Sequence, residues 1–348
     1  MSQSDFKPRV TISTIAEKSG FSPSTVSRVL NGRAKEYRIS KETVDKILKV
    51  NSEYNYQPNP VAVNLRMKKS FTIGLVIPSL NNPFFVDITS FLNSQLRKKG
   101  YNILLAESEE DLQTEEEIIK QLYERNIDGI IIIPCDKKNH NNQILDKIYT
   151  DGTPIIYIDR YITNSIIPHI VTDNEKGAYE GIKYLIEMGH KKIACIQGLE
   201  GSSPCIDRKN GYLKALSDYN LEPSFIGGDE FNIECGIRET ENILKKKEKP
   251  TAIFAMSSTI ALGVMKTLER YEYNIPNDIS LLGFDDYIFL DYLATPLTTI
   301  SQPVDEISKL TVKALVDHLD GKEKLEKFKS IKLDTEIIHR KSIHKPKF

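Results

Sequence analysis

A short run of polar side chains on one face of a predicted helix is the first feature of this chain that could perform recognition chemistry. Apolar residues recur at helical spacing at Val26, Val29 and Leu30, so these side chains would pack inward. The residues left facing outward are Ser24, Thr25, Ser27 and Arg28. Small hydroxyls and one guanidinium can exchange hydrogen bonds with base edges in the major groove of DNA.

Two short helices joined by a tight turn are needed to present that face. Apolar residues also recur at helical spacing before Gly20, and glycine readily takes the left-handed conformation that closes such a turn. Ser22 followed by Pro23 is typical of a helix start, with serine as N-cap and proline at the first helical position. The stretch 11–31 therefore predicts a helix-turn-helix.

A third amphipathic helix and a short fourth helix follow. After the basic loop 33–38, Ser40 caps a segment with four apolar residues that we expect to face the first two helices. These are Val44, Ile47, Leu48 and Val50. Asn59 then caps a helix that opens at Pro60 and is about two turns long. The three longer helices can enclose a small core, whereas the short one is marginal in water by itself.

Charge is distributed unevenly along the chain. Residues 1–70 hold 13 Lys and Arg against 6 Asp and Glu, and the remainder holds 34 against 42. The first segment therefore carries about +7 and the rest about −8. A basic head on an acidic body concentrates the attraction for phosphates at one end of the molecule.

From Phe71 onward, short apolar strands alternate with amphipathic helices. We expect a first set of strands at 72–77, 102–106, 129–133 and 155–158. We expect a second set at 170–171, 192–196, 252–255 and 280–284, with helices at 177–188 and 260–271. This alternation of strands and helices is typical of parallel sheets, and two doubly wound lobes are the simplest fold that accommodates it. A ligand of such sheets binds outside the carboxyl ends of the strands, which places one ligand between the lobes.

Composition argues against several other classes of protein. The chain has 348 residues and 40% hydrophobic content, enough for a small domain and a large two-lobed one, with no run long enough to cross a membrane. The first residues lack the apolar core of a secretory signal, so we expect a cytoplasmic protein. The four cysteines have no metal-ligand spacing, and neither a P-loop nor a dinucleotide fingerprint follows a predicted strand. His190 precedes a strand, and we expect it to close a turn rather than to act in catalysis. We therefore expect no catalytic residue, and none of these patterns indicates a metal or a cofactor.

Many ordered motifs along nearly the whole chain resemble the lactose-repressor/galactose-repressor (LacI/GalR) family of bacterial transcription regulators. In the head, the motifs are V-S-R-V-L-N-G at 26–32 and Y-x-P-N-x-x-A-x-x-L at 56–65. In the body, they are I-G-L-V-I-P at 73–78, N-P-F-F at 82–85, D-G-I-I-I at 128–132, I-D-R at 158–160, M-G-H-K-K-I at 188–193, R-x-x-G at 208–211, S-L-L-G-F-D-D at 280–286 and P-L-T-T-I at 296–300.

The resemblance implies a multidomain fold, with an all-α helix-turn-helix head and an α/β two-lobed, periplasmic-binding-protein-like core. The chain would cross between lobes near residues 171, 301 and 329. The expected parts are a DNA-binding domain at 1–57, a hinge helix and linker at 58–70, an N-terminal lobe at 71–171 and 303–329, and a C-terminal lobe at 172–302 and 330–346.

The resemblance also assigns roles to individual residues. Contacts to base edges are expected from Ser24, Thr25 and Arg28, and contacts to phosphates from Thr11, Ser22, Ser27 and Asn31. The hinge residues expected at DNA are Asn59, Ala62 and Leu65. Leu65 would wedge into a central base step through the minor groove, which is compatible with an apolar contact between paired hinge helices.

Nine residues are expected to hold an effector between the lobes. They are Asn82, Phe85, Asp159, Arg160, Arg208, Phe231, Ser257, Asp285 and Gln302. Carboxylates and arginines that exchange hydrogen bonds with hydroxyls, together with an aromatic ring against an apolar sugar face, specify a polyol.

Two departures from the family pattern bear on ligand and DNA binding. The family commonly has an Asn-Asp or similar pair where this chain has Ser257 and Ser258, so a carboxylate facing the cleft is lost and the ligand need not be a simple neutral hexose. The loop 32–39 is about three residues longer than usual. Lys35 and Arg38 there would either make additional phosphate contacts or belong to a solvated loop.

These observations favour a repressor that binds double-stranded DNA as a homodimer on a pseudo-palindromic operator. We expect a small molecule, a sugar or sugar derivative, to control it. Two other classes stay open: a regulator controlled by a protein corepressor, and a solute-binding protein. The missing export signal and the basic head argue against the second, and an enzyme is the weakest alternative. No long heptad pattern follows Arg340, which favours a dimer over a helix-bundled tetramer.

Overall fold

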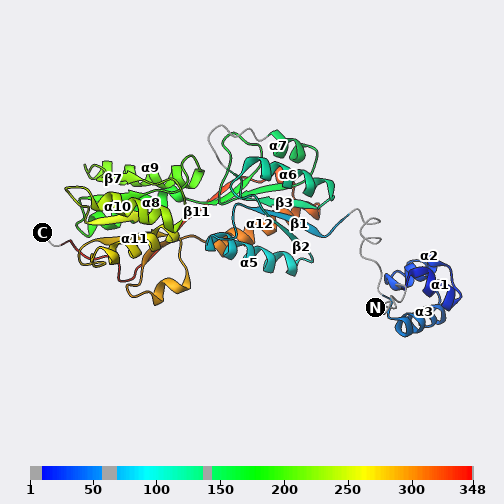
Figure 1. Cartoon of the computed structure of the whole chain (residues 1–348). Helices are drawn as coiled ribbons and strands as arrows, with labels where there is room; N and C mark the ends of the chain where they lie inside the picture. Colours follow the sequence, from blue (N-terminus) through cyan, green and yellow to red (C-terminus); the bar gives the residue numbers. More distant parts are fainter. Residues whose placement is uncertain (1–9, 57–68, 136–142, 347–348) are drawn as a thin grey trace, which may run out of the picture. The chain divides into compact units, whose positions relative to one another are not determined.

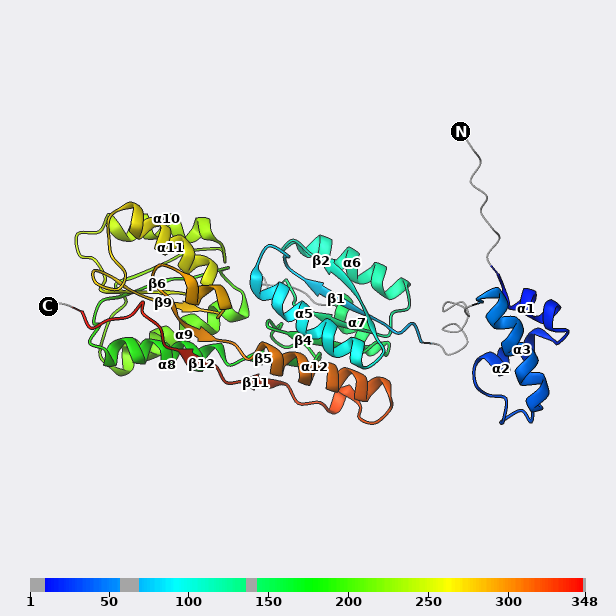
Figure 2. The ribbon, with the colours of Figure 1, turned by 90° about the horizontal axis from the view of Figure 1, so that it is seen from below.

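A computed structural model describes residues 10–56, 69–135 and 143–346. The chain divides into two compact units, Met1–Ser70 and Phe71–Phe348, called here the head and the core. Figures 1 and 2 show the elements of each unit. The predicted hinge helix, with Asn59, Ala62 and Leu65, lies outside the described residues.

The head contains the three predicted helices: α1 (Ile12–Ser19), α2 (Pro23–Leu30) and α3 (Lys41–Tyr54). Local sequence fixes their limits. The hydroxyl oxygens of Thr11, Ser22 and Ser40 each accept a backbone N–H of the first turn, and Gly20 closes α1 at φ 76°. Buried side chains from all three helices form one core, which consists of Ile15, Ala16, Val26, Val29 and Ile47. The helix-turn-helix prediction is confirmed.

One predicted core residue of the head is not buried. Leu48 is 46% exposed, whereas the neighbouring Ile47 is fully buried and Val44 and Val50 are partly buried. The prediction that Leu48 faces α1 and α2 is therefore wrong. Two short helices cover only a narrow stripe of α3, and Ile47 occupies its centre.

The first sheet of the core has the strand order β11-β5-β4-β3-β1-β2. Its strands are β1 (Thr72–Ile77), β2 (Asn102–Glu107), β3 (Gly129–Ile132), β4 (Ile155–Ile158), β5 (His169–Thr172) and β11 (Ile331–Leu333). The helices of this lobe are α5 (Pro83–Lys98), α6 (Leu112–Glu124), α7 (Gln143–Thr150) and α12 (Val304–Leu319), with a short 3₁₀ turn η2 (Leu325–Lys327). All the pairings in this sheet are parallel.

The second sheet repeats the same plan, with the order β12-β10-β9-β8-β6-β7. Its strands are β6 (Ile193–Ile196), β7 (Phe225–Gly227), β8 (Ala252–Ala255), β9 (Ser280–Phe284), β10 (Thr298–Ser301) and β12 (Glu336–Ile338). The helices are α8 (Asn174–Glu187), α9 (Ser203–Asp218), α10 (Ile233–Leu244) and α11 (Ser258–Arg270), with the 3₁₀ turn η1 (Ile288–Tyr292). Only β12 runs antiparallel, against β10.

Helices cover both faces of each sheet. In the first lobe α5 packs against α12 and α6 against α7, and in the second α8 packs against α9 and α10 against α11 (Figures 1 and 2). The central strands β3, β4, β8 and β9 are consequently buried at every position. Because helices bury both faces of these strands, their sequences are continuous apolar runs rather than alternating apolar and polar residues.

The chain passes between the lobes three times, and two details differ from expectation. β5 pairs with β4 and β11, so residues 170–171 belong to the first sheet and not to the second set of strands. β11 also lies in the first sheet, whereas β12 lies in the second. The third crossing therefore falls between residues 333 and 336 rather than near 329, and 330–333 belong to the N-terminal lobe. Strands of three residues carry too little pattern to show which sheet they join.

Candidate functional site

The outward face of α2 carries the polar residues predicted to read DNA. Ser24 and Arg28 are exposed, and Thr25 and Ser27 are half-buried. The N-cap hydroxyl of Ser22 lies 2.8 Å from the Ser24 hydroxyl and 2.9 Å from that of Thr25. These hydroxyls form one connected polar surface at the amino end of α2, where unpaired backbone N–H groups favour an anion such as phosphate.

Arg28 is held by the loop that follows α2. Its guanidinium carbon lies 4.0 Å from the centre of the Tyr37 ring. Arg33 lies 5.3 Å from the same ring and donates two hydrogen bonds, of 2.6 and 2.7 Å, to Glu36. The loop after α2 thus places an aromatic ring against the predicted base-reading arginine. Lys35 and Arg38 are both exposed at its surface.

Asn31 ends α2 and is tied to the same helix. Its side-chain amide donates to the Ser27 carbonyl oxygen at 2.6 Å and to the Ser27 hydroxyl at 3.2 Å. Thr11 caps α1 in a capping box with Thr14. The hydroxyl of each threonine accepts the backbone N–H of the other, and the two hydroxyls also lie 3.2 Å apart. Of the four residues predicted to hold phosphates, Thr11, Ser22 and Asn31 therefore cap helix ends, and Ser27 lies within α2.

The carboxyl ends of the two sheets of the core enclose a cavity. All nine residues predicted to hold an effector line it, together with Phe84 and Pro204. The cavity is narrow, about 20 Å³, and shares four lining residues with a wider chamber of about 730 Å³. These shared residues are Asn82, Phe85, Arg160 and Phe231. We call the two spaces the inner cavity and the outer chamber.

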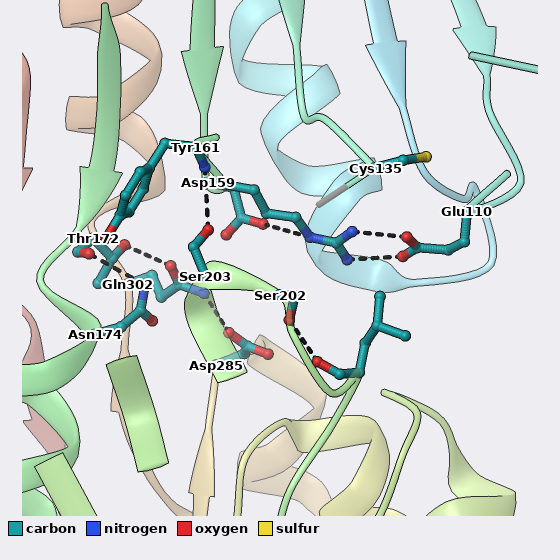
Figure 3. Close-up of polar contacts among 12 residues, drawn as sticks. Glu110, Cys135, Asp159, Tyr161, Thr172, Asn174, Ser202, Ser203, Asp285 and Gln302 are labelled. Carbon is teal, nitrogen blue, oxygen red and sulfur yellow. Dashed lines mark hydrogen bonds and ion pairs between the residues drawn. The ribbon is translucent and has the colours of Figure 1, made fainter. Parts of the chain in front are cut away.

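Asp159 and Arg160 enter the inner cavity from the end of β4. Asp159 is 5% exposed and takes φ 62°, a left-handed conformation rare for a non-glycine residue. The two terminal nitrogens of Arg160 each donate to Glu110 at 2.8 Å, and its Nε lies 3.9 Å from an Asp159 oxygen (Figure 3). A fully buried guanidinium is thus neutralised on two sides within the first lobe.

Arg208 faces this group from α9 in the second lobe. Its Nε donates to Asn174 at 2.8 Å, and one terminal nitrogen donates to the Met256 carbonyl oxygen at 2.5 Å. The guanidinium lies 3.6 Å from the centre of the Phe284 ring, and its other terminal nitrogen lies 3.9 Å from Asp285. Two of its five N–H donors therefore tie α9 to the start of α8 and to the residue after β8, and the other terminal nitrogen lies nearest to Asp285.

A chain of hydrogen bonds links the lobes behind the cavity. The Thr172 hydroxyl of β5 donates to Gln302 at 2.5 Å, and the Gln302 amide donates to Asp285 at 2.6 Å (Figure 3). The backbone N–H of Tyr161 also donates to the Ser203 hydroxyl at 3.1 Å. Relative movement of the lobes must therefore lengthen or bend these bonds.

Burial sets the electrostatics of the two aspartates. It raises the pKa of Asp159 to about 6, while Arg160 and Arg208 oppose the rise and the nearby Asp285 adds to it. Burial likewise raises the pKa of Asp285 against the opposing effect of Arg208. Both carboxylates are thus costly to keep ionised without a ligand.

The remaining predicted residues complete the walls. Asn82 caps α5 by accepting the N–H of Phe84 at 3.1 Å, and Ser257 caps α11 by accepting that of Ile260 at 3.2 Å. Phe231 packs so closely on Gly198 that a methyl group there would lie 2.1 Å from its ring. Aromatic rings from both lobes therefore line the cavity, Phe84 and Phe85 from the first and Phe231 from the second.

Comparison with known proteins identifies this arrangement. Residues 11–59 match the family model of bacterial regulatory proteins of the lacI family, and residues 70–326 match that of periplasmic binding proteins and the sugar-binding domain of the LacI family. This chain is a member of the LacI family. It is a DNA-binding transcriptional regulator and not an enzyme.

Individual relatives in the LacI family match over nearly the full length. The chain is 36% identical to the NTD biosynthesis operon regulator NtdR of Bacillus subtilis, covering 95% of this chain and 99% of that protein. It is 31% identical to the ribose operon repressor of Haemophilus influenzae, covering 96% and 98%. The lac repressor dimer bound to operator and the anti-inducer ONPF aligns with a TM-score of 0.85 at 25% identity, covering 97% of this chain and 100% of that one.

Several cleft residues of this LacI-family member were missed by the sequence analysis. Phe84 and Pro204 line the inner cavity, Glu110 binds Arg160, and Asn174 binds Arg208. Glu110 was within reach of prediction, because it belongs to the acidic run that directly follows β2 and so lies at a carboxyl strand end. The role of Asn174 was not, since nothing local distinguishes it from an ordinary residue in the first turn of a helix.

Other expectations concern sites that a regulator does not need. Among the described residues, no cluster of His, Cys, Asp and Glu is arranged to hold a metal ion, and no helix has the length and apolar character needed to cross a membrane. All four cysteines are free and buried. His190 is 1% exposed, and its Nδ1 lies 2.9 Å from the Thr251 hydroxyl, which fits the predicted structural role.

Proposed function

We propose that this regulator binds a sugar or sugar derivative between the lobes of its core, and that the bound effector changes its affinity for operator DNA. The observation that carries the proposal is the inner cavity, where two carboxylates, two guanidiniums and three phenyl rings converge from both lobes. Charged hydrogen-bonding groups suit hydroxyls, and phenyl rings suit the apolar face of a sugar ring.

Coupling between cleft and DNA would use the connections between lobes. A ligand that contacts Asp159 in one lobe and Arg208 in the other binds most tightly when the lobes are close together. Closure would act on the bonds from Tyr161 to Ser203 and from Thr172 to Gln302. The coupling is reciprocal, so operator DNA must change effector affinity by the same factor as the effector changes operator affinity.

The regulator is proposed to bind DNA as a homodimer on a pseudo-palindromic operator, one recognition helix to each half-site. Large exposed apolar side chains on both lobes support a self-complementary surface. They are Leu80, Val86 and Phe91 in the first lobe, which are 45, 44 and 40% exposed, and Ile288 and Tyr292 in the second, which are 79 and 82% exposed. Contacts from Ser24, Thr25 and Arg28 to bases, and the Leu65 wedge, stay predictions of this proposal.

The test begins with a thermal-shift screen of the full-length protein against sugars, sugar derivatives and nucleobases. A ligand at about 100 times its dissociation constant stabilises by roughly 2.7 kcal/mol, which such a screen detects. Each hit is then added to a fluorescence-anisotropy titration with operator DNA selected from a random pool. A hit that changes operator affinity supports effector control and gives its sign. If no hit changes operator affinity, the proposal fails.

Two arginine variants make the test specific for the cleft. Arg208→Met should lose the effector response, because it removes donors that face the cavity. Arg238→Met is the matched control, since Arg238 lies in the same lobe, is half exposed and pairs with Asp229 outside the lining residues. Equal effects of the two substitutions on ligand binding would remove Arg208 from the proposed site.

A further inference from the structure

The outer chamber is strongly acidic. Five carboxylates line it: Glu109, Glu110, Asp111, Glu230 and Glu234. Arg160 is the one cationic residue among its described lining residues, and both terminal nitrogens of that arginine are bound to Glu110. Together with Asp159 and Asp285, the described walls of the two spaces hold seven carboxylates against two arginines.

Some of these carboxylates have structural partners and others do not. Asp111 caps α6 by accepting the N–H of Thr114 at 2.8 Å, and Glu230 accepts from the Asn232 amide. Glu109 and Glu234 are exposed and form no ion pair with any described residue. Exposed acids of this kind are common on protein surfaces and do not by themselves define a site.

Asp159 supplies the independent observation. It is 5% exposed and faces the inner cavity, yet no described residue donates a hydrogen bond to its carboxylate. Its nearest cation is the Arg160 Nε at 3.9 Å, which is itself buried without a hydrogen-bond partner. Asp285, the corresponding aspartate of the second lobe, instead accepts from Gln302 at 2.6 Å. A buried carboxylate that faces a cavity without protein donors suits a ligand that brings several.

The inner cavity is too small for a whole sugar in this arrangement. Its 20 Å³ corresponds to about one or two water molecules, whereas the outer chamber offers 730 Å³. Much of any carbohydrate would therefore lie in the outer chamber, beside its carboxylates. Such surroundings repel uronic acids and sugar phosphates and attract a cation.

We propose that the effector is an amino sugar, with a primary ammonium group that donates to Asp159 and a ring that extends into the outer chamber toward Glu109 and Glu230. This inference rests on the proposed function, because it assigns the chemical class of that effector. An ammonium group carries three donors and a full positive charge, whereas a hydroxyl carries one donor and no charge. It therefore satisfies the Asp159 carboxylate and offsets part of the excess negative charge.

The experiment is isothermal titration of the full-length protein at pH 7.5 with glucose, N-acetylglucosamine and the aminodeoxyglucoses that carry the amine at carbon 2, 3, 4 or 6. We expect at least one amine to bind about tenfold or more tightly than glucose, as a charge-assisted hydrogen bond implies. The advantage should shrink as sodium chloride is raised from 0.02 to 0.5 M, because the chamber is open to solvent.

Matched variants locate the amine. Asp159→Asn should abolish the advantage of the amine over glucose, and Glu109→Gln with Glu230→Gln should reduce it. Glu115→Gln is the control, since Glu115 is a carboxyl residue of the same lobe, 1% exposed, that lines neither space. Failure of every aminodeoxyglucose to bind, equal binding of glucose or N-acetylglucosamine, or an advantage that survives in Asp159→Asn would each overturn the inference.

Operator titrations on the same preparation separate this inference from the proposed function. An amino sugar that binds through Asp159 without changing operator affinity supports the ligand class and contradicts effector control. A neutral sugar or a nucleobase that binds more tightly than every amine, and changes operator affinity, supports effector control and overturns the ligand class.

Discussion

Replacing Asp159 with asparagine should make the ligand-free protein more stable. An ordinary aspartate pKa is 3.8, and burial raises that of Asp159 to about 6. At 1.36 kcal/mol for each pH unit, keeping the carboxylate ionised in the folded state costs about 3 kcal/mol at pH 8. Asparagine is neutral and nearly isosteric, and it tolerates the left-handed φ of 62° at this position. The substitution therefore removes most of this cost.

The gain should depend on pH in a defined direction. Because the folded pKa is raised, the folded state binds the proton more tightly than the unfolded state does between pH 3.8 and about 6. The wild-type protein thus recovers the lost stability as the pH falls through that window. The advantage of Asp159→Asn should be full at pH 8, about half as large at pH 5 and small at pH 4.

Differential scanning calorimetry of both proteins at pH 8, 5 and 4 measures this effect. An unfolding entropy of about 2.1 cal/mol/K per residue, over the residues from Phe71 to Phe348, converts 3 kcal/mol to a rise of about 5 °C in Tm. The same variant should lose the advantage of amino sugars over glucose, so stability and ligand selectivity would change in opposite directions. An unchanged or lower Tm at pH 8, or a gain equally large at pH 4, would refute the reasoning.

Three further substitutions test other parts of the structure. Gly198→Ala should push the Phe231 ring into the cleft, because the new methyl group would lie 2.1 Å from that ring. The variant should lose ligand-induced Tm shifts and keep its ligand-free operator affinity within about twofold. Normal ligand binding by the variant would contradict this packing. Ile15→Ala should destabilise the head by about 2–5 kcal/mol and abolish operator binding, with calorimetry showing the core transition unmoved. Tyr37→Ala should weaken operator binding about two- to fivefold in anisotropy titrations, because Arg28 loses its aromatic support, whereas Tyr37→Phe should bind like the wild type.

Local sequence determined the helix-turn-helix of the head. Helix caps and tight turns act within a few residues of their own position, so their effect can be predicted from the sequence alone. Here they are the N-caps Thr11, Ser22 and Ser40 and the turn at Gly20. The exposure of Leu48 could not be predicted from the sequence, because it depends on how much of α3 the two short helices cover. Helical periodicity shows that a residue is on the apolar side, but not where that side ends.

The doubly wound core and the positions of its cavity-lining residues were also largely predictable. Strands buried on both faces are apolar throughout, and parallel strands present their carboxyl ends at one edge, so residues after those ends converge. The motifs then selected eight side chains that all line the inner cavity, and the departure from the family pattern at Ser257 added a ninth.

Tertiary structure alone decided which sheet the short strands join and how the cleft charges are paired. β11 and β12 have three residues each, and their membership depends on open sheet edges far away in the sequence. The bond from Arg160 to Glu110 spans 50 residues, and that from Thr172 to Gln302 spans 130. Caps and periodicity arise from short-range sterics and hydrogen bonds that the sequence displays directly. Which carboxylate is left without a donor depends on long-range packing, which only the folded chain specifies.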